Sequence, residues 1–353
     1  MKNLDIKPKD VCRWDFVSLG EVLLRFDPED ERIQNTRSFR VWDGGAEYNA
    51  AKNLAKVFRQ RTTIVTALAD NALGRLAEDL ANQGGVDASN IIWRDADSNQ
   101  TRNGIYFIER GFGLRPPTSC FDRANTAISQ LETGEIDWKK IFGSENGSRW
   151  FHTGGVFSGL SENAPSVAAE AMKFAKESGT IVSYDLNYRD SLWKMRGGRA
   201  EANRINKTLL PFADAVFGVL DLEAKFADFD AEKFQQTAEK MQTEFPNLKI
   251  IATTLREIRS ASLHNLSAAC LAGGEVFKAR DYENVAVLDR VGSGDAFAAG
   301  FIFGLLTDKG VKYALECGAA HACLAMTTPG DNSMAQLAEI EKLMQGEGSN
   351  VIR

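Results

Sequence analysis

Short apolar segments alternate with segments of helical period along most of this chain, and no other feature limits the possible folds as strongly. Residues 63–68 are predicted to form a buried strand and residues 73–81 a helix, which ends at the glycine pair 84–85. Such alternation is typical of parallel strands joined by right-handed helical crossovers. We therefore predict an α/β fold with a doubly wound, mostly parallel sheet flanked by helices.

Two pairs of segments interrupt this alternation. Residues 22–42 are predicted to form a hairpin around a charged turn, and residues 104–109 and 118–123 form a second pair of strands with no helix between them. We predict that these segments make a small separate β-sheet. The predicted organisation is one domain over residues 14–346, with the small sheet contributed by about 21–43 and 103–124.

Composition excludes several classes of partner. The chain of 353 residues is 44% hydrophobic and 25% charged, and its net charge of −6 gives no electrostatic support for binding nucleic acid. No stretch of the sequence approaches the roughly 18 to 20 apolar residues of a membrane span, and residues 1–13 are too charged for a signal peptide. We expect no nucleic-acid partner, no membrane partner and a cytoplasmic location.

Cysteine and histidine usage argues against a protein metal centre. The five cysteines form no Cys-x-x-Cys pair, and the sequence has only three histidines. Reduced, mostly buried thiols are the expected state of such cysteines. We predict that no metal ion is held by protein ligands alone.

The segment Asp-Arg-Val-Gly-Ser-Gly-Asp at residues 289–295 is the strongest candidate for a functional site. The apolar run 285–288 before it predicts a buried strand, and residues 296–306 after it predict an apolar helix. Glycines between a strand and a helix leave backbone N–H groups uncovered, and these groups bind anions together with the helix dipole.

The aspartate of this segment has an unusual position for a phosphate-binding turn. Gly292 and Gly294 can adopt positive φ, and Asp295 places a carboxylate beside the anion site. A carboxylate would repel a phosphate held there permanently. Its presence favours a hydroxyl that lies between the two groups and attacks the phosphorus, with Asp295 as the base. We expect the helix N-terminus to lower the pKa of Asp295.

The same residues also fit a plain helix start, with Asp295 as N-cap and the glycines as a turn. Other phosphate-binding motifs do not fit. A dinucleotide fingerprint needs a third glycine where Phe297 stands, and no Gly-Lys-Ser/Thr of a Walker loop occurs. The His-Arg-Asp and Asp-Phe-Gly set of protein kinases is also absent from the sequence.

Residues 289–300 resemble the C-terminal signature of the ribokinase, or PfkB, family of small-molecule kinases, which usually contains Asp-Thr-x-Gly-Ala-Gly-Asp. This chain has Arg290 in place of the threonine and Ser293 in place of the alanine. The resemblance implies that Asp295 is the catalytic base. It also implies an anion hole formed by the residues before the base, namely Gly292, Ser293 and Gly294.

Residues 44–49, Gly-Gly-Ala-Glu-Tyr-Asn, resemble the N-terminal PfkB signature as it occurs in 2-keto-3-deoxygluconate kinases. The resemblance implies that Gly44, Gly45 and Asn49 contact the sugar. A helix start with an alanine-rich packing face is the alternative interpretation.

A second part of the sugar site is implied by residues 185–189, Asp-Leu-Asn-Tyr-Arg, which again resemble these kinases. Ligands gather at the carboxyl ends of strands in doubly wound sheets, and these residues end a predicted strand. The resemblance implies that Arg123 and Arg189 bind the carboxylate of a sugar acid and that Tyr106 contacts the same sugar. Without the resemblance, both arginines would be interpreted as solvated surface residues.

The resemblance also implies ATP and Mg²⁺ as cofactors, with magnesium bridging the phosphates mainly through water. The residues assigned to the nucleotide are Thr254, Arg256, Asp289, Gly292, Gly294 and Gly330. The family usually has an Asn-x-x-Glu motif that helps to order magnesium. Its asparagine is missing here, and either Asp221 or Glu223 could take over this role.

The resemblance implies an ATP-dependent sugar kinase that phosphorylates the terminal hydroxyl of 2-keto-3-deoxygluconate, giving 2-keto-3-deoxy-6-phosphogluconate. The alternatives are another PfkB sugar kinase, resembling a fructokinase or a ribokinase, and a non-catalytic sugar-binding protein. The expected partners are the sugar acid and ATP. The resemblance implies a homodimer or higher homo-oligomer formed through the small sheet, which would act as a lid over the sugar.

Overall fold

A large central sheet organises the protein. The computed structural model describes residues 4–96, 100–143 and 147–347. Within them, eleven strands form one sheet in the order β14-β13-β12-β11-β10-β9-β1-β4-β5, with β15 paired to β13 and β6 paired to β4. All strands from β12 to β6 are parallel, and β13, β14 and β15 add an antiparallel edge. The predicted mostly parallel α/β sheet is confirmed.

The strands of this sheet are β1 (Phe16–Leu19), β4 (Thr62–Ala69), β5 (Val86–Asp87), β6 (Ile91–Arg94), β9 (Trp150–Gly154), β10 (Ile181–Asp185), β11 (Ala215–Phe217), β12 (Ile250–Ser260), β13 (Leu263–Ala272), β14 (Glu275–Lys278) and β15 (Tyr282–Ala286). The α-helices are α1 (Ala46–Lys56), α2 (Ala72–Gln83), α3 (Trp138–Phe142), α4 (Gly155–Ser158), α5 (Ala164–Glu177), α6 (Asp190–Trp193), α7 (Gly198–Leu209), α8 (Ala231–Glu244), α9 (Ser293–Leu306), α10 (Gly310–Ala325) and α11 (Leu337–Gln345). Short 3₁₀ turns occur at η1 (Lys9–Val11), η2 (Ile128–Gln130), η3 (Lys194–Arg196) and η4 (Leu210–Phe212).

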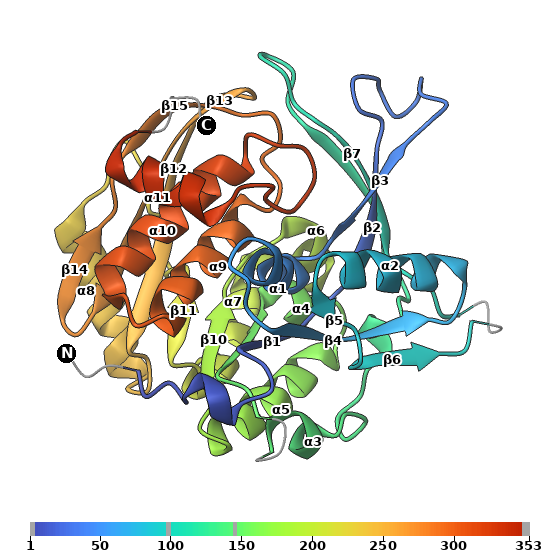
Figure 1. Cartoon of the computed structure of the whole chain (residues 1–353), viewed down its shortest axis with the longest axis horizontal. Coiled ribbons are helices and arrows are strands. Elements are labelled where there is room, and N and C mark those ends of the chain that lie inside the picture. Colours follow the sequence, from blue (N-terminus) through green and yellow to red (C-terminus); the bar gives the residue numbers. More distant parts are fainter. Residues whose placement is uncertain (1–3, 97–99, 144–146, 348–353) are drawn as a thin grey trace.

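Helices cover both faces of the sheet (Figure 1). Successive side chains of a strand point to opposite faces, and accordingly Ile250 and Ala252 belong to one hydrophobic core while Ile251 belongs to the other. The first core includes residues of α1, α2, α9, α10 and α11, and the second includes residues of α3 to α8. Burial on both faces explains why β4 is buried along its whole length.

Small residues bring α9 and α10 into close contact. A Cβ on Gly300 would lie 2.9 Å from the carbonyl oxygen of Cys317, and one on Gly318 would lie 2.8 Å from that of Phe297. Because these helices pack backbone to backbone, α9 is held in the core, and its first residue, Ser293, accepts a hydrogen bond from Arg256 on β12.

A second, four-stranded sheet projects from the main body (Figure 1). Its strands are β2 (Leu23–Asp27), β3 (Arg40–Gly44), β7 (Ile105–Glu109) and β8 (Thr118–Asp122), in the order β3-β2-β7-β8. The two hairpins are antiparallel, and β2 pairs with β7 in parallel, with Arg25 opposite Tyr106. The predicted small separate sheet is confirmed, and we refer to these four strands as the lid.

Three predicted element boundaries were wrong. The strand before the central turn is β15, which ends at Ala286 rather than at residue 288 and is mostly exposed, because it is an edge strand paired only with β13. Helix α9 begins at Ser293, three residues before the predicted start. Strand β12 continues to Ser260, where the sequence had suggested an end near residue 252, because β13 pairs alongside it.

The described residues contain no helix that is both long and apolar enough to cross a membrane.

Candidate active site

Two glycine turns that lie far apart in the sequence come together in the structure. Helix α1 follows Gly45, which has φ 135°, and α9 follows Gly292, which has φ 75°. The side-chain amide of Asn49 donates a hydrogen bond to Oδ2 of Asp295, with an Nδ2–Oδ2 distance of 2.7 Å, and both residues are buried. The predicted sugar-contact turn and the predicted catalytic turn therefore face each other.

Backbone geometry explains why glycine occupies position 292. Its φ of 75° is in the left-handed region, and a Cβ there would lie 1.8 Å from the carbonyl oxygen of Asp331. Gly294 differs from our expectation, because it lies inside α9 and does not have a positive φ. A Cβ on Gly294 would meet no atom of the described protein within 4 Å, so this glycine leaves open space at the N-terminus of α9.

The predicted anion site corresponds to the first turn of α9, and its binding of an anion stays a prediction. The N–H groups of Ser293, Gly294 and Asp295 are in the first turn of the helix, where no carbonyl of the same helix can accept from them. These donors and the open space at Gly294 can receive a phosphate oxygen.

Burial controls the protonation of Asp295. Burial raises its pKa well above the usual carboxyl range, and the charges of Asp185 and Asp331 act in the same direction. The hydrogen bond from Asn49 and the charge of Arg189 oppose this rise. Our expectation of a lowered pKa was wrong, because loss of hydration outweighs the helix dipole at this buried position.

Three arginines bring positive charge to the same turn. Arg256 on β12 donates a hydrogen bond to Oγ of Ser293, and Arg290 immediately precedes the glycine turn. Burial and the charges of Arg290 and Arg189 lower the pKa of Arg256 to about 10. Within the described part of the chain, Arg189, Arg256 and Arg290 have no carboxylate within 4.0 Å. These arginines repel one another and none is in contact with a carboxylate of the described residues, which favours an anionic ligand beside them.

The lid and the core sheet supply the predicted carboxylate-binding arginines. Arg123 follows β8 and donates from Nη2 to Oγ of Ser191 on α6, over 3.3 Å, and from Nη1 to Oε2 of Glu21, also over 3.3 Å. Arg189 is the N-cap of α6 and is exposed. Arg123 therefore contacts α6, the short helix whose N-cap residue is Arg189.

The hydroxyl of Tyr106 is already engaged within the protein. Its ring is buried and stacks on Phe121 at a centroid distance of 5.1 Å, and its hydroxyl donates a hydrogen bond to Oδ2 of Asp331. A contact between Tyr106 and the sugar stays a prediction.

Comparison with known proteins agrees with the geometry. The profile of the pfkB family carbohydrate kinases matches residues 15–337, which is most of the chain. The chain belongs to this family of carbohydrate kinases. It is 29% identical over 342 residues to the 2-dehydro-3-deoxygalactonokinase of Haloferax volcanii, an alignment that covers 96% of this chain and 99% of that relative.

Solved structures give the same result. The crystal structure of 2-dehydro-3-deoxygluconokinase from Thermotoga maritima has 35% sequence identity and a TM-score of 0.85, covering 94% of this chain and 99% of that one. A putative ribokinase II from E. coli, solved in complex with ATP and Mg²⁺, has a TM-score of 0.75 and covers 94% of this chain and 99% of that one. Its 18% identity establishes likeness of fold alone.

The residues assigned to the nucleotide in this pfkB kinase fall into two groups. Thr254 and Arg256 are two residues apart on β12, so their side chains leave the same face of the strand, beside α9. Asp289 and Gly330 lie together instead, with the N–H of Gly330 donating to Oδ2 of Asp289 over 3.3 Å. Asp289 is buried and also accepts from the side chain of Arg25, so its carboxylate serves the protein rather than a nucleotide.

The sequence prediction missed Arg25. It lies in the apolar segment Val-Leu-Leu-Arg-Phe at residues 22–26, and its side chain is completely buried. A lone cation inside an apolar strand was the available signal, because a buried arginine requires carboxylate partners. Those partners come from segments elsewhere in the chain, which the sequence alone does not place.

A second missed feature is a pair of buried carboxylates, Glu21 and Glu47, close enough to the half-buried Asp185 for their charges to interact. Burial raises the pKa of Glu47 to about 7 and that of Asp185 to about 6, and it also raises the pKa of Glu21. Oε1 of Glu47 accepts a hydrogen bond from the N–H of Phe157, over 3.0 Å. Burial therefore favours the neutral form of these carboxyl groups, and the ion pair with Arg123 opposes this effect at Glu21.

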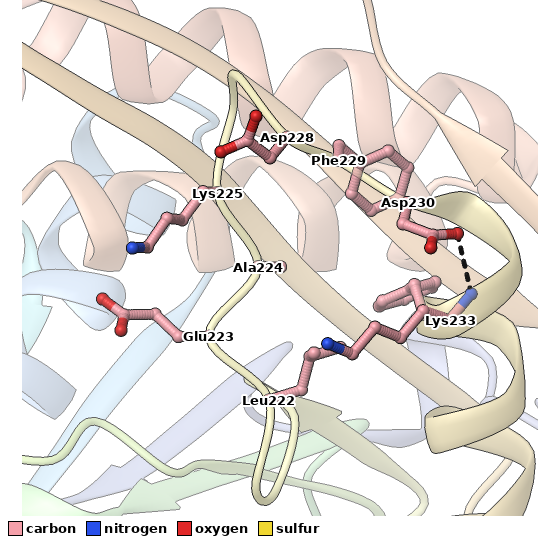
Figure 2. Close-up of a pocket in the computed structure, with 9 residues that line it drawn as sticks. Leu222, Glu223, Ala224, Lys225, Asp228, Phe229, Asp230 and Lys233 are labelled. Carbon is pink, nitrogen blue, oxygen red and sulfur yellow. Dashed lines mark hydrogen bonds between the residues drawn. The ribbon is translucent and has the colours of Figure 1, made fainter.

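The loop that replaces the Asn-x-x-Glu motif borders a separate hollow (Figure 2). Asp221 accepts a hydrogen bond from Nδ2 of Asn203 over 3.0 Å, whereas Glu223 is exposed and lines the hollow together with Lys225. Lys225 forms a backbone bridge with Arg256, so this loop lies directly beside β12. Glu223 is therefore the freer of the two candidate carboxylates.

The donor set fits magnesium that arrives with a nucleotide. Across residues 4–96, 100–143 and 147–347, no three His, Cys, Asp or Glu side chains cluster closely enough to hold a metal ion. Mg²⁺ in kinases is usually bound by one or two carboxylates together with substrate phosphates. The exposed carboxylate of Glu223 and the open space at Gly294 are compatible with that arrangement.

Proposed function

We propose that this carbohydrate kinase transfers the γ-phosphoryl group of ATP to the terminal hydroxyl of a 2-keto-3-deoxy sugar acid, with 2-keto-3-deoxygluconate as the first candidate. The observation that carries the proposal is the buried pair of Asn49 and Asp295 at the start of helix α9. In the described part of the chain, the neighbouring Arg256 and Arg290 make no ion pair with a carboxylate within 4.0 Å.

In the proposed reaction the substrate hydroxyl lies between Asp295 and the γ-phosphate. Its oxygen forms a bond to phosphorus, the bond from phosphorus to the bridging oxygen of ADP breaks, and the hydroxyl proton passes to Asp295. The high pKa of this buried carboxyl favours proton acceptance once the group is ionised. Magnesium bound to the phosphates would neutralise part of their charge.

The chain supplies its own stabilisation of the transferring group. In this proposal, the N–H donors of the first turn of α9 and the guanidinium groups of Arg256 and Arg290 stabilise the negative charge that develops on the transferring group. The contact of Arg256 with Ser293 in this turn supports the assignment. In a loose transition state this charge spreads over the phosphoryl oxygens, and fixed donors stabilise it without reorganisation. We propose Arg290, which replaces the usual threonine of the signature, as an additional phosphate contact.

A sugar acid accounts for the arginines better than a neutral sugar does. Arg123 is held by single, long contacts to Glu21 and Ser191, and Arg189 is exposed, so both retain donors for a carboxylate. An arginine binds a carboxylate through two parallel hydrogen bonds, whereas a neutral fructose or ribose would leave this charge unused. The named relatives from Thermotoga maritima and Haloferax volcanii support a 2-keto-3-deoxy sugar acid.

The galactonate epimer is the second candidate, because the relative from Haloferax volcanii is a 2-dehydro-3-deoxygalactonokinase. The two acids share the carboxylate, the keto group and the terminal hydroxyl, so the arginines and Asp295 do not discriminate between them.

A substrate panel tests the proposal. ADP release should be measured with both 2-keto-3-deoxy sugar acids, gluconate, fructose and ribose, with ATP and Mg²⁺ present. We expect kcat/KM for at least one of the keto-deoxy acids to exceed that for every neutral sugar. Faster phosphorylation of fructose or ribose would refute the substrate class, and absence of turnover with all compounds would favour a sugar-binding protein.

We also propose that the lid forms the contact between subunits. Phe112 and Leu114, at the tip of the β7–β8 hairpin, have relative exposures of 75% and 101%. Exposed apolar side chains grouped at one tip are typical of a surface covered in an oligomer. Light scattering should give the mass of a dimer or larger for the wild type and a smaller mass for Phe112→Ser/Leu114→Ser. A monomeric wild-type protein would refute this contact.

A further inference from the structure

Arg25 on β2 of the lid joins three segments of the chain. Its side chain has no solvent exposure. Nη1 lies 2.8 Å from Oδ1 of Asp331, Nη2 lies 2.8 Å from Oδ2 of Asp27, and Nη2 also bonds Oδ2 of Asp289. Asp27 belongs to the lid, whereas Asp289 precedes the glycine turn of α9 and Asp331 lies in the loop after α10.

Asp289 transmits this contact to the catalytic turn. Its Oδ1 accepts a hydrogen bond from the N–H of Val291 over 3.1 Å, and Val291 is the residue before Gly292. One carboxyl group therefore binds Arg25 through one oxygen and orders the approach to the N-terminus of α9 through the other.

Asp331 contacts both glycine turns of the site. Its carbonyl oxygen is packed so closely on Gly292 that a Cβ there would lie 1.8 Å away, and its carboxylate is packed on Gly44, where a Cβ would lie 2.3 Å away. The same carboxylate binds Arg25 through Oδ1 and Tyr106 through Oδ2. Arg25 and Tyr106 are paired neighbours on β2 and β7, so the lid holds Asp331 with two adjacent side chains.

The cost of this network argues for a function beyond general stability. Burying charged groups incurs a desolvation penalty, and the attraction between the charges often offsets this penalty without a net gain in stability. Apolar side chains would commonly stabilise a core equally well. Arg25 is one cation among three carboxylates. Among the described residues, the only other cation within 4.0 Å of these carboxylates is Arg110, whose Nε lies 3.5 Å from Oδ2 of Asp27. The arrangement instead gives precise and coupled positions to the two turns.

We propose that Arg25 is a positioning residue that sets the turn at residues 289–292 and couples it to the lid, so that the anion site is correctly shaped for phosphoryl transfer. Arg25 does not touch the reacting groups and acts through Asp289 and Asp331. The proposal rests on the kinase function proposed above. It predicts an effect mainly on kcat, because the substrates are bound by other residues.

The test compares Arg25→Lys with Arg110→Gln. Lysine retains the charge at position 25 but lacks the planar fork, so it does not bridge all three carboxylates. Arg110→Gln removes the other cation at Asp27 and leaves Asp289 and Asp331 untouched, which makes it a matched control. Kinetic constants should be measured with the best substrate that the panel identifies for the wild type. Hydrogen exchange should be followed in peptides that contain Val291.

We expect Arg25→Lys to lower kcat at least tenfold, to change KM for ATP and for the sugar less than threefold, and to speed exchange of the 289–292 amides. Arg110→Gln should change none of these. Near-normal kcat in Arg25→Lys, an equal loss in Arg110→Gln, or faster exchange throughout the protein would overturn the proposal.

A third variant removes the side chain of Arg25 and tests whether a soluble guanidinium compound can take its place. In Arg25→Gly, added methylguanidinium at millimolar concentration should restore part of kcat, whereas the same concentration of sodium chloride should not. If this variant does not fold, the lysine variant still decides the question. If the wild type phosphorylates no compound of the panel, the kinase proposal fails, and the exchange measurement alone still tests whether Arg25 orders the turn.

Discussion

The hydrogen bond from Asn49 to Asp295 should be measurable in the pH dependence of the reaction. The donor favours the ionised carboxylate, so Asn49→Ala should raise the pKa of Asp295 further above its already raised value. A hydrogen bond to a charged group contributes about 1.5–3 kcal/mol, and one pKa unit corresponds to about 1.36 kcal/mol. The expected rise is therefore about one to two pH units.

The sign follows from the role of the base. Asp295 accepts a proton only when it is ionised, so activity is lost as the pH falls through its folded pKa. In Asn49→Ala the acid limb of kcat/KM should move to higher pH by about one to two units, and at a fixed pH on that limb the rate should fall about 10- to 100-fold.

The control lies one helical turn further along α1. The side chain of Asn53 is also buried, and its Oδ1 accepts from the N–H of Ser333 over 3.0 Å. Asn53→Ala should therefore disturb α1 without moving the acid limb. If Asn49 only contacts the sugar, Asn49→Ala would raise KM for the sugar and leave the limb in place. An unshifted limb would thus refute the assignment of Asn49 as the partner that tunes Asp295.

Other changes separate chemistry from stability. Asp295→Asn should lower kcat about 100-fold or more, and an unchanged kcat would exclude Asp295 as the base. The same variant should raise Tm at pH 8 more than near pH 4, because the stability that a carboxyl with a raised folded pKa contributes to the protein is lost as the pH rises through that pKa. Gly294→Ala should lower activity while leaving Tm unchanged or raising it, with a gain of up to about 1 kcal/mol in the free energy of unfolding. Gly292→Ala should lower both activity and Tm. A lower Tm in Gly294→Ala would contradict the open space at this position. Arg189→Ala should raise KM for the sugar acid about 30-fold and leave KM for ATP nearly unchanged, and an unaltered sugar-acid KM would remove it from the carboxylate site.

Much of the architecture could be predicted from local patterns. Alternating strands and helices, the two lid hairpins and both glycine turns appear in the order and nearly at the positions predicted. Each of these patterns depends on side-chain period or on backbone freedom over a few residues. The length of β12 was less predictable, because the part of this strand that contains Thr254 and Arg256 is formed by pairing with β13.

The sequence by itself determined which functional groups are present and where they lie along the chain: a carboxylate after one glycine turn, an asparagine after another, and arginines at strand ends. Only the tertiary structure decided how these groups behave. Burial raises the pKa of Asp295, whereas the helix dipole alone would lower it. The carboxylate of Asp289 forms an ion pair with Arg25 rather than being free for a nucleotide. Desolvation and ion pairing depend on which distant segments surround a group, and here Arg25 and Asp331 come together across 306 positions of the chain.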